Sequence, residues 1–293
     1  MTLSTVKSAG WIDAHQHFWQ PARGDYGWLT PDLTALYRDF MPGDLQEILA
    51  QQGIARTVVV QAAPSVAETA FLLDLAARHD FIAGVVGWID FGASDAVDHL
   101  RNRAQNPTFV GVRPMIQDIA DIDWMLNPAF DPVFQTLIDL DLAFDALVHP
   151  RHLSNLHRLV MRYPDLRVVI DHGAKPKIRN GIHGPDGYDT WAPLMTEFAP
   201  LGSVSCKISG LLTEAGPGAG LHDLKPYLDH LLRVFGADRL MWGSDWPVLE
   251  LAGDYAAWAD MSHRWLGGLR SDDSAKIAGT TAAKFYRMSK NAG

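Results

Sequence analysis

The chain has 293 residues, of which 47% are hydrophobic and 20% are charged, and its formal net charge is −9. This composition excludes wholesale disorder, and an acidic balance without any run of Lys or Arg argues against a nucleic-acid partner. The longest mostly apolar run, residues 81–89, is far shorter than the ~20 residues that a membrane helix needs.

The cysteine content and the first residues bear on the compartment. Cys206 is the only cysteine, so no intramolecular disulfide can form, as suits a reducing cytosol. Its apolar surroundings predict a buried structural thiol. Residues 1–10 lack the apolar core of a signal peptide. We therefore expect a cytoplasmic protein with no membrane partner, while the sequence leaves the oligomeric state undetermined.

Eight short apolar runs, rich in Val and Ile, alternate with longer amphipathic stretches along the chain. Several of these runs are apolar on both faces, as parallel strands covered by helices should be. Capping pairs mark the intervening helices, for example Asp44 with Glu47 and Ser65 with Glu68, and Gly236 marks a helix end. The predicted strands span residues 11–18, 56–62, 82–90, 109–115, 142–148, 167–171, 203–208 and 240–243.

Eight strand–helix units with short connections predict an α/β fold, a single (β/α)8 barrel domain over residues 1–293. A doubly wound open sheet is the alternative, but no glycine-rich phosphate loop follows the first strand. Three connections are long and all follow strands, at residues 19–43, 173–190 and 210–221. In a barrel these loops lie at the C-terminal ends of the strands, where active sites are built.

The first predicted strand carries two histidines in the segment WIDAHQH. Because side chains alternate across a strand, His15 and His17 project on the same face. With the apolar residues of the other face against the helices, both imidazoles point into the barrel mouth. Two imidazoles there can bind one divalent metal or donate hydrogen bonds to a developing oxyanion.

Two more polar residues follow later strands. His172 ends the sixth strand and Asp245 ends the eighth. A carboxylate at such a position can be a metal ligand, a general base towards water, or both in turn. Considered singly, Asp245 would be an ordinary helix cap and His172 a buried core residue. Together with His15 and His17 they predict one catalytic site at the barrel rim.

The order of these residues resembles the amidohydrolase superfamily, with His-x-His after strand one, His after strand six and Asp after strand eight. The segments IDAHQHFW, GVR, DHGAKP, KISGL and MWGSDWPV are similar to the branch that hydrolyses sugar lactones, and the likeness runs from Trp11 to the final helix. The resemblance implies a lactonase of carbohydrate catabolism, a hydrolase acting on a carboxylic ester. Asp245 would activate the water, and the three histidines would stabilise the oxyanion.

The resemblance also bears on the metal content. Superfamily members with two metals bridge them with a carboxylated Lys or a Glu on strand four or five, and neither strand ends in such a residue here. We expect at most one divalent metal, zinc by preference, held by His15, His17 and Asp245, with His149 or His172 as a further ligand. Catalysis without any metal, with the histidines polarising the carbonyl directly, is the alternative.

Residues around the rim are expected to bind the substrate. Arg113 can donate several hydrogen bonds to hydroxyl or carbonyl oxygens, and Lys175 lies at a strand end. Lys207 is either a substrate contact or part of an ion pair with a neighbouring carboxylate. His149 is a metal ligand, a substrate contact or a structural residue. Further candidates are the rings of Trp19 and Trp28, which can stack on a sugar, and the carboxylates of Asp90 and Glu214.

No dense basic cluster lines these loops, so the sequence favours a neutral sugar-acid lactone over a dicarboxylate. The resemblance points to L-fucono-1,5-lactone or a related aldono-lactone, and it fixes neither the sugar stereochemistry nor the ring size. One competing hypothesis is a metal-dependent decarboxylase on the same fold. Another is a barrel that binds sugar acids without turning them over.

Overall fold

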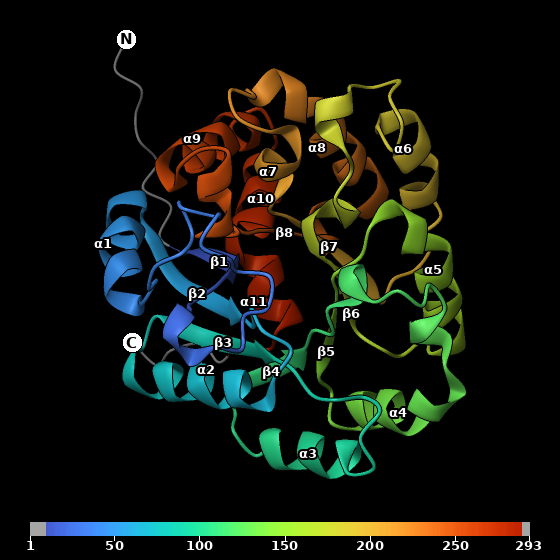
Figure 1. The fold of residues 1–293 in the computed structure, drawn as a ribbon. Coiled ribbons are helices and arrows are strands. Elements are labelled where there is room, and N and C mark those ends of the chain that lie inside the picture. The colour runs from blue at the N-terminus through green and yellow to red at the C-terminus, as the bar shows by residue number, and fades with distance from the viewer. Residues whose placement is uncertain (1–9, 289–293) are drawn as a thin grey trace.

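The computed structural model describes residues 10–288, and its strands form one parallel eight-stranded sheet in chain order (Figure 1). This order confirms the predicted (β/α)8 barrel and excludes the doubly wound alternative, whose strand order reverses part-way. Residues 1–9, which carry the expectation that no signal peptide is present, lie outside the described part of the chain. The strands are β1 (Trp11–Gln16), β2 (Ile54–Val60), β3 (Ile82–Gly87), β4 (Phe109–Val112), β5 (Ala143–Ala146), β6 (Val168–Ile170), β7 (Val204–Ile208) and β8 (Leu240–Trp242).

The barrel is closed between β1 and β8 just beyond the ends of these strands. Gln16 forms a parallel bridge with Trp246, and the amide of His17 donates to the carbonyl of Trp246 at 2.7 Å. The amide of Asp245 donates to the carbonyl of His15 at 2.8 Å. Several strands end earlier than predicted, β1 at residue 16 instead of 18, because the chain turns at the rim. Closure therefore fixes the two histidines of β1 against the carboxylate that follows β8.

Helices surround the barrel (Figure 1). Ser65 caps α2 as predicted, accepting a hydrogen bond from the amide of Glu68 at 3.0 Å. The prediction that Asp44 caps the start of α1 was wrong by about one turn, because the helix begins at Pro42. Asp44 lies inside its first turn, where its carboxylate accepts a hydrogen bond from the amide of Met41. The helices are α1 (Pro42–Gln52), α2 (Val66–Arg78), α3 (Ala96–Arg103), α4 (Asp131–Asp139), α5 (Leu153–Arg162), α6 (Tyr188–Thr196), α7 (Leu211–Ala215), α8 (Leu221–Phe235), α9 (Tyr255–Leu266), α10 (Ser271–Ala275) and α11 (Thr281–Phe285).

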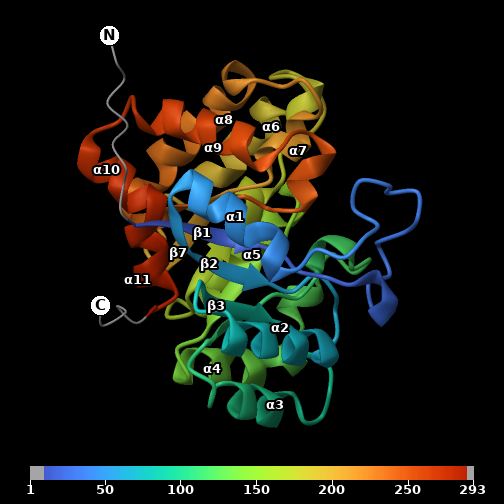
Figure 2. The same cartoon turned by 90° about the vertical axis from the view of Figure 1, so that its left-hand side faces the viewer.

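The hydrophobic core has two parts. The larger part lies between the strands and the surrounding helices, and the smaller part fills the barrel interior with residues such as Val60, Val86 and Val169. Phe285 of α11 and Tyr286 directly after it belong to this inner cluster. Figure 2 shows α11 at the end of the barrel where β1 begins, opposite the long loop that follows β1. The C-terminal helix thus closes one end and leaves the other for the site.

The long connections follow strands, as predicted. Residues 17–41 follow β1, residues 171–187 follow β6, and residues 209–220, which include α7, follow β7. A fourth long connection, residues 113–130 between β4 and α4, was not predicted. It contains short 3-10 helices with apolar residues, so its sequence does not look like one continuous loop. Among the described residues, no helix is long and apolar enough to span a membrane.

Candidate active site

Four side chains converge at the C-terminal end of the barrel. The Oδ1 atom of Asp245 lies 3.3 Å from Nε2 of His17, 3.7 Å from Nε2 of His15 and 3.8 Å from Nε2 of His172. All four residues are at least 95% buried. The structure therefore brings together the four residues that the sequence predicted as one site, and it does so from β1 and from the ends of β6 and β8.

Two of these residues adopt an unusual backbone conformation. His172 has φ 53° and Asp245 has φ 61°, in the left-handed region that costs a non-glycine residue about 1–3 kcal/mol. The surrounding hydrogen bonds impose it, since the amide of Asp245 is held by the carbonyl of His15. In this conformation the side chains of His172 and Asp245 lie 3.8 Å apart.

The hydrogen-bond partners of the imidazoles constrain their tautomers. Nδ1 of His17 lies 2.7 Å from the carbonyl oxygen of Val60, and a carbonyl can only accept, so this nitrogen carries the proton. Nε2 of His17 then has a lone pair facing the carboxylate of Asp245. Two acceptors in contact require a proton or a cation between them. Nδ1 of His172 contacts the hydroxyl of Ser209 at 2.9 Å.

A divalent cation fits this arrangement. Ligand atoms of a tetrahedral site with bonds of about 2.0–2.1 Å lie roughly 3.3–3.4 Å apart, close to the 3.3 Å and 3.7 Å that separate Asp245 from His17 and His15. Those three residues form a group of potential ligands among the described residues, and His15, Asp171 and His172 form another. His149 belongs to neither group, so the structure does not support it as a metal ligand.

Burial sets the protonation states of these groups. It lowers the pKa of His17 and lowers that of His172 to about 4, so both imidazoles are neutral at pH 7. Burial raises the pKa of Asp245, but the neighbouring histidines, His172 first, outweigh it and hold the pKa below its ordinary value. An ionised carboxylate among neutral imidazoles can take a proton from water and accommodate a cation.

Beneath the histidines lies a fully buried group of charges. Nζ of Lys207 is 2.6 Å from Asp145, 3.0 Å from Asp171 and 3.0 Å from Nδ1 of His15. The sequence left two interpretations of Lys207 open, and the structure supports the ion pair. Its ammonium is enclosed below the imidazoles, with 0% exposure, and so cannot serve as a rim contact for substrate.

Arg113 reaches the site from the end of β4. Its Nη1 lies 3.2 Å from Nε2 of His15 and 3.6 Å from Asp171, and its Nη2 donates to the carbonyl of Gln61. The Nε atom is buried without a hydrogen-bond partner. The guanidinium of Arg113 therefore lies beside the imidazole of His15 with one donor still unused.

The outer edge of the site carries Lys175, Glu214 and His149. Nζ of Lys175 donates to Oε1 of Gln117 at 2.9 Å and lies 3.8 Å from Glu214. Burial, followed by the charges of Lys175 and Arg151, lowers the pKa of His149 to about 4. His149 is therefore a neutral, half-buried imidazole close to Lys175.

The two loop tryptophans differ in exposure. Trp28 is partly exposed, and its indole N–H donates to the carbonyl of Ala62 just after β2. Trp19 is fully buried, its indole donates to the carbonyls of Leu36 and Arg38, and its ring packs edge-on against Trp28. The prediction that Trp19 contacts substrate was wrong, because its donor and its ring faces are used in packing.

Asp90 is also a structural residue. It is exposed and its carboxylate accepts a hydrogen bond from the amide of Gly92 inside its own turn, so the structure gives no support to its role in substrate binding.

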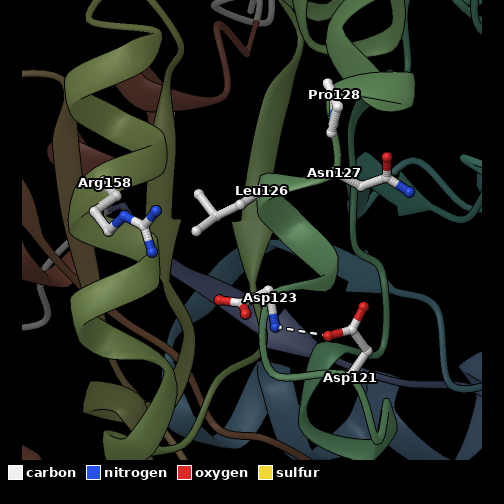
Figure 3. A pocket seen from close by; sticks show the side chains of 6 residues that line it. All are labelled: Asp121, Asp123, Leu126, Asn127, Pro128 and Arg158. Atoms are coloured by element: carbon white, nitrogen blue, oxygen red, sulfur yellow. Dashed lines mark hydrogen bonds between the residues drawn. The ribbon is translucent and has the colours of Figure 1, made fainter.

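A surface pocket, drawn in Figure 3, is lined by residues of the connection between β4 and α4, among them Asp121 and Asp123, and by Arg158 of α5. None of its lining residues belongs to the histidine cluster.

Sequence reasoning missed Asp145, Asp171 and Gln61 as parts of the site. Asp145 lies inside the buried strand β5, where an acidic residue between apolar neighbours signals a paired charge. Asp171 directly precedes His172 and contacts both Lys207 and Arg113. Gln61 gave no signal of its own, because it binds Arg113 through its backbone carbonyl.

The comparisons with known proteins agree with this geometry. The sequence matches the profile of the amidohydrolase family over residues 12–288. The chain belongs to the amidohydrolase family. This confirms the family that the motifs indicated, and the match covers the barrel from β1 to the end of α11.

Relatives of this amidohydrolase are found in Burkholderia. It is 47% identical to the L-fucono-1,5-lactonase of Burkholderia ambifaria, over 96% of this chain and 97% of that protein. It is 34% identical to the L-fucono-1,5-lactonase of Burkholderia multivorans, over 94% and 96%. The crystal structure of an amidohydrolase from Burkholderia multivorans with bound zinc superposes with a TM-score of 0.90 at 34% identity, covering 96% of this amidohydrolase and 100% of that chain.

Proposed function

We propose that this amidohydrolase hydrolyses a neutral sugar-acid lactone, L-fucono-1,5-lactone or a closely related aldono-lactone, to the free aldonic acid. The observation that carries the proposal is the ionised Asp245 within 3.3–3.8 Å of three imidazole nitrogens. The two relatives that are L-fucono-1,5-lactonases support this substrate. They do not favour a decarboxylase or a binding protein without turnover.

Asp245 is the general base in this proposal. Its carboxylate takes a proton from the attacking water while the oxygen of that water forms a bond to the lactone carbonyl carbon. The C–O bond to the ring oxygen then breaks, and Asp245 returns the proton to that oxygen. Because the leaving alkoxide stays attached to the product, one base with oxyanion stabilisation suffices.

The oxyanion formed on the carbonyl oxygen is stabilised by the groups facing Asp245. When no cation is bound, His15, His172 and Arg113 supply N–H donors in a buried, low-dielectric site, where such donors are most effective. A single divalent cation, zinc in this proposal, would be held by His15, His17 and Asp245. When bound it would supply Lewis-acid polarisation of the carbonyl.

The rim residues bind the hydroxyl groups of the sugar. Lys175 and His149 provide a cation and a neutral imidazole on one side of the site, and the partly exposed ring of Trp28 provides an apolar surface on another. Glu214, 3.8 Å from Lys175, is an acceptor for a hydroxyl. This mixture suits a neutral polyol better than a dicarboxylate.

The test is acid release from a panel of aldono-lactones, followed with a pH indicator in weak buffer. Fast hydrolysis of L-fucono-1,5-lactone that survives a chelator would show that the histidines act directly. Hydrolysis that is lost to the chelator and restored by zinc would show that one metal is required. If no lactone is hydrolysed under either condition, the proposed function is wrong.

A further inference from the structure

The outer edge of the site holds two opposite charges that form no hydrogen bond with each other. Nζ of Lys175 and Oε1 of Glu214 are 3.8 Å apart, whereas a hydrogen bond between an ammonium and a carboxylate spans about 2.7–2.9 Å. Lys177, in the same loop, reaches Asp186 at 2.7 Å although both side chains are more than half exposed. The gap between Lys175 and Glu214 therefore needs an explanation in their surroundings.

Lys175 is held by a neutral amide instead of by the carboxylate. Its Nζ donates to Oε1 of Gln117 at 2.9 Å. The backbone of Gln117 is itself fixed, because its amide donates to the carbonyl of Leu147 at 3.0 Å and its carbonyl accepts from Nη2 of Arg151 at 3.0 Å. Gln117 thus sets the position of the ammonium group and uses one of its three protons.

Glu214 is held in place through its backbone. Arg179, in the loop after β6, donates from Nη2 to the carbonyl of Thr213 at 2.9 Å and from Nε to the carbonyl of Glu214 at 3.3 Å. The carboxylate of Glu214 accepts no hydrogen bond from the described residues, although its side chain is only 16% exposed. A largely buried acceptor without a partner is costly, so this carboxylate is suited to receive a donor from a bound molecule.

Both charges lie beside the catalytic residues. The amide of Lys175 donates to the carbonyl of His172 at 2.9 Å, closing a tight turn that carries both side chains. Burial first, and then the charge of Asp245, raises the pKa of Glu214 against the opposite effect of Lys175. Because such effects fall off with distance, Glu214 and Asp245 are neighbours across the site.

A hydroxyl group of a sugar fits between these two charges. An ammonium only donates hydrogen bonds and a carboxylate only accepts them, whereas a hydroxyl does both. One hydroxyl oxygen can accept from Nζ of Lys175 and donate to Oε1 of Glu214, which are too far apart to satisfy each other. A carboxylate group in the same place would be repelled by Glu214. A carbon without a hydroxyl would leave both charges unsatisfied.

We propose that Lys175 and Glu214 bind one and the same hydroxyl group of the lactone, and that this pair selects neutral lactones carrying that hydroxyl. The proposal rests on the proposed lactonase function and deepens it. It assigns the preference for a hydroxyl, over a carboxylate or a hydrogen at the same position, to a single pair of side chains from the loops after β6 and β7.

The test measures the binding of L-fucono-1,5-lactam, in which an N–H group replaces the ring oxygen and makes the molecule resistant to hydrolysis. Its mono-deoxy derivatives, each lacking one hydroxyl, are compared with it by calorimetry. The proteins are the wild type, K175M, E214L and the double variant K175M/E214L. The matched control is D186N, which removes the exposed ion pair of Lys177 in the same loop.

In the wild type, one mono-deoxy lactam is expected to bind ~10–100-fold more weakly than the parent lactam, the size of a hydrogen bond to a charged group. K175M and E214L should each bind the parent more weakly and lose most of this difference. The double variant should bind it no more weakly than the poorer single variant, because both side chains hold one hydroxyl. D186N should keep the wild-type difference.

The proposal is overturned if all mono-deoxy lactams bind the wild type as tightly as the parent, or if the difference persists in E214L. Equal weakening of every lactam by a substitution would show a structural role only, and failure of the parent lactam to bind would also overturn the proposal. These measurements need no turnover. A protein that discriminates between the lactams as expected but hydrolyses no lactone would overturn the proposed function alone.

Discussion

At the scale of single residues, the site depends on small neighbours that admit the histidines. A Cβ atom at Gly210 would lie 2.6 Å from Nδ1 of His172, and one at Gly243 would lie 2.8 Å from Cβ of His15. Both distances are shorter than real contacts allow, so the ends of β7 and β8 require glycine at these positions. The space they leave lets both imidazoles turn towards Asp245.

Replacement of Asp245 with Asn should abolish the base without changing the shape of the site. We expect kcat to fall by about 10²–10⁴-fold, the usual contribution of a positioned acid–base group, while the circular dichroism spectrum stays as in the wild type. The control is D272N in the exposed start of α10, which should keep full activity. Activity of D245N within a few-fold of the wild type would contradict the assigned role.

Replacement of Lys175 with Ala should affect binding more than chemistry. Lys175 lies at the edge of the site, between Gln117 and Glu214, where it can hold a hydroxyl equally well in the substrate and in the transition state. Such uniform binding appears in KM. We expect KM for the lactone to rise about tenfold with kcat changed less than threefold, and steady-state kinetics would measure both. A large loss of kcat at unchanged KM would instead place Lys175 in the chemical step.

At the scale of elements, the buried carboxyl group of Glu68 is one of the groups that fix the loop of residues 17–41 to the barrel. Glu68 near the start of α2 accepts from the hydroxyl of Tyr26 at 2.7 Å and from the amide of Ala62 at 3.1 Å. The carbonyl of Ala62 in turn accepts from the indole of Trp28. The sequence indicated Glu68 as part of a capping pair, but its side chain is used to dock this loop.

The docking of this loop predicts a pH dependence of stability. Burial raises the pKa of Glu68 from 4.5 to about 7, so the folded state binds the proton more tightly than the unfolded state. The contribution of this group is full below pH 4.5 and is lost as the pH rises through about 7. At about 1.4 kcal/mol per pKa unit, the rise from 4.5 to about 7 limits the loss to ~3.5 kcal/mol.

The variant E68Q imitates the protonated carboxyl group and should remove this dependence. Urea unfolding at several values between pH 5 and pH 8 measures the free energy of unfolding of both proteins. We expect the wild type to lose stability relative to E68Q as the pH rises. Parallel curves for the two proteins would show that Glu68 does not titrate differently on folding.

At the scale of the whole molecule, the barrel has one end for packing and one for chemistry. α11 seals the end where β1 begins, with Phe285 and Tyr286 in the inner cluster. Tyr286 also reaches Asp145 with its hydroxyl at 2.6 Å, so the C-terminal segment is joined through Asp145 and Lys207 to the underside of the site. Tyr286, Asp145 and Lys207, which are far apart in sequence, thus form one continuous set of buried contacts.

This arrangement predicts that α11 is part of the cooperative core. Replacement of Phe285, which is 9% exposed, with Ala should lower the free energy of unfolding by about 3 kcal/mol, as large-to-small changes in cores do. The control is M161A, at a position 62% exposed, which should change it by less than about 0.5 kcal/mol. Chemical unfolding measures both, and equal effects would indicate that α11 is peripheral.

The sequence by itself determined the fold class and the four central residues. Both follow from local patterns, because the period of a strand places His15 and His17 on one face, and a parallel barrel brings strand ends such as those at His172 and Asp245 to one rim. The resemblance of the sequence motifs to amidohydrolases then indicated that the site hydrolyses a lactone. No local pattern revealed that Trp19 is enclosed by its own loop.

Only the tertiary structure decided how Lys207 is used and which nitrogen of His17 faces Asp245. Those properties depend on contacts between residues far apart in the chain, such as Lys207 with Asp145 and with His15, which are 62 and 192 positions away. A charged residue inside a strand pattern is compatible with a substrate contact or with a buried pair. Closure of the barrel settles the choice, because it encloses the ammonium and leaves it only carboxylates and one imidazole nitrogen as partners.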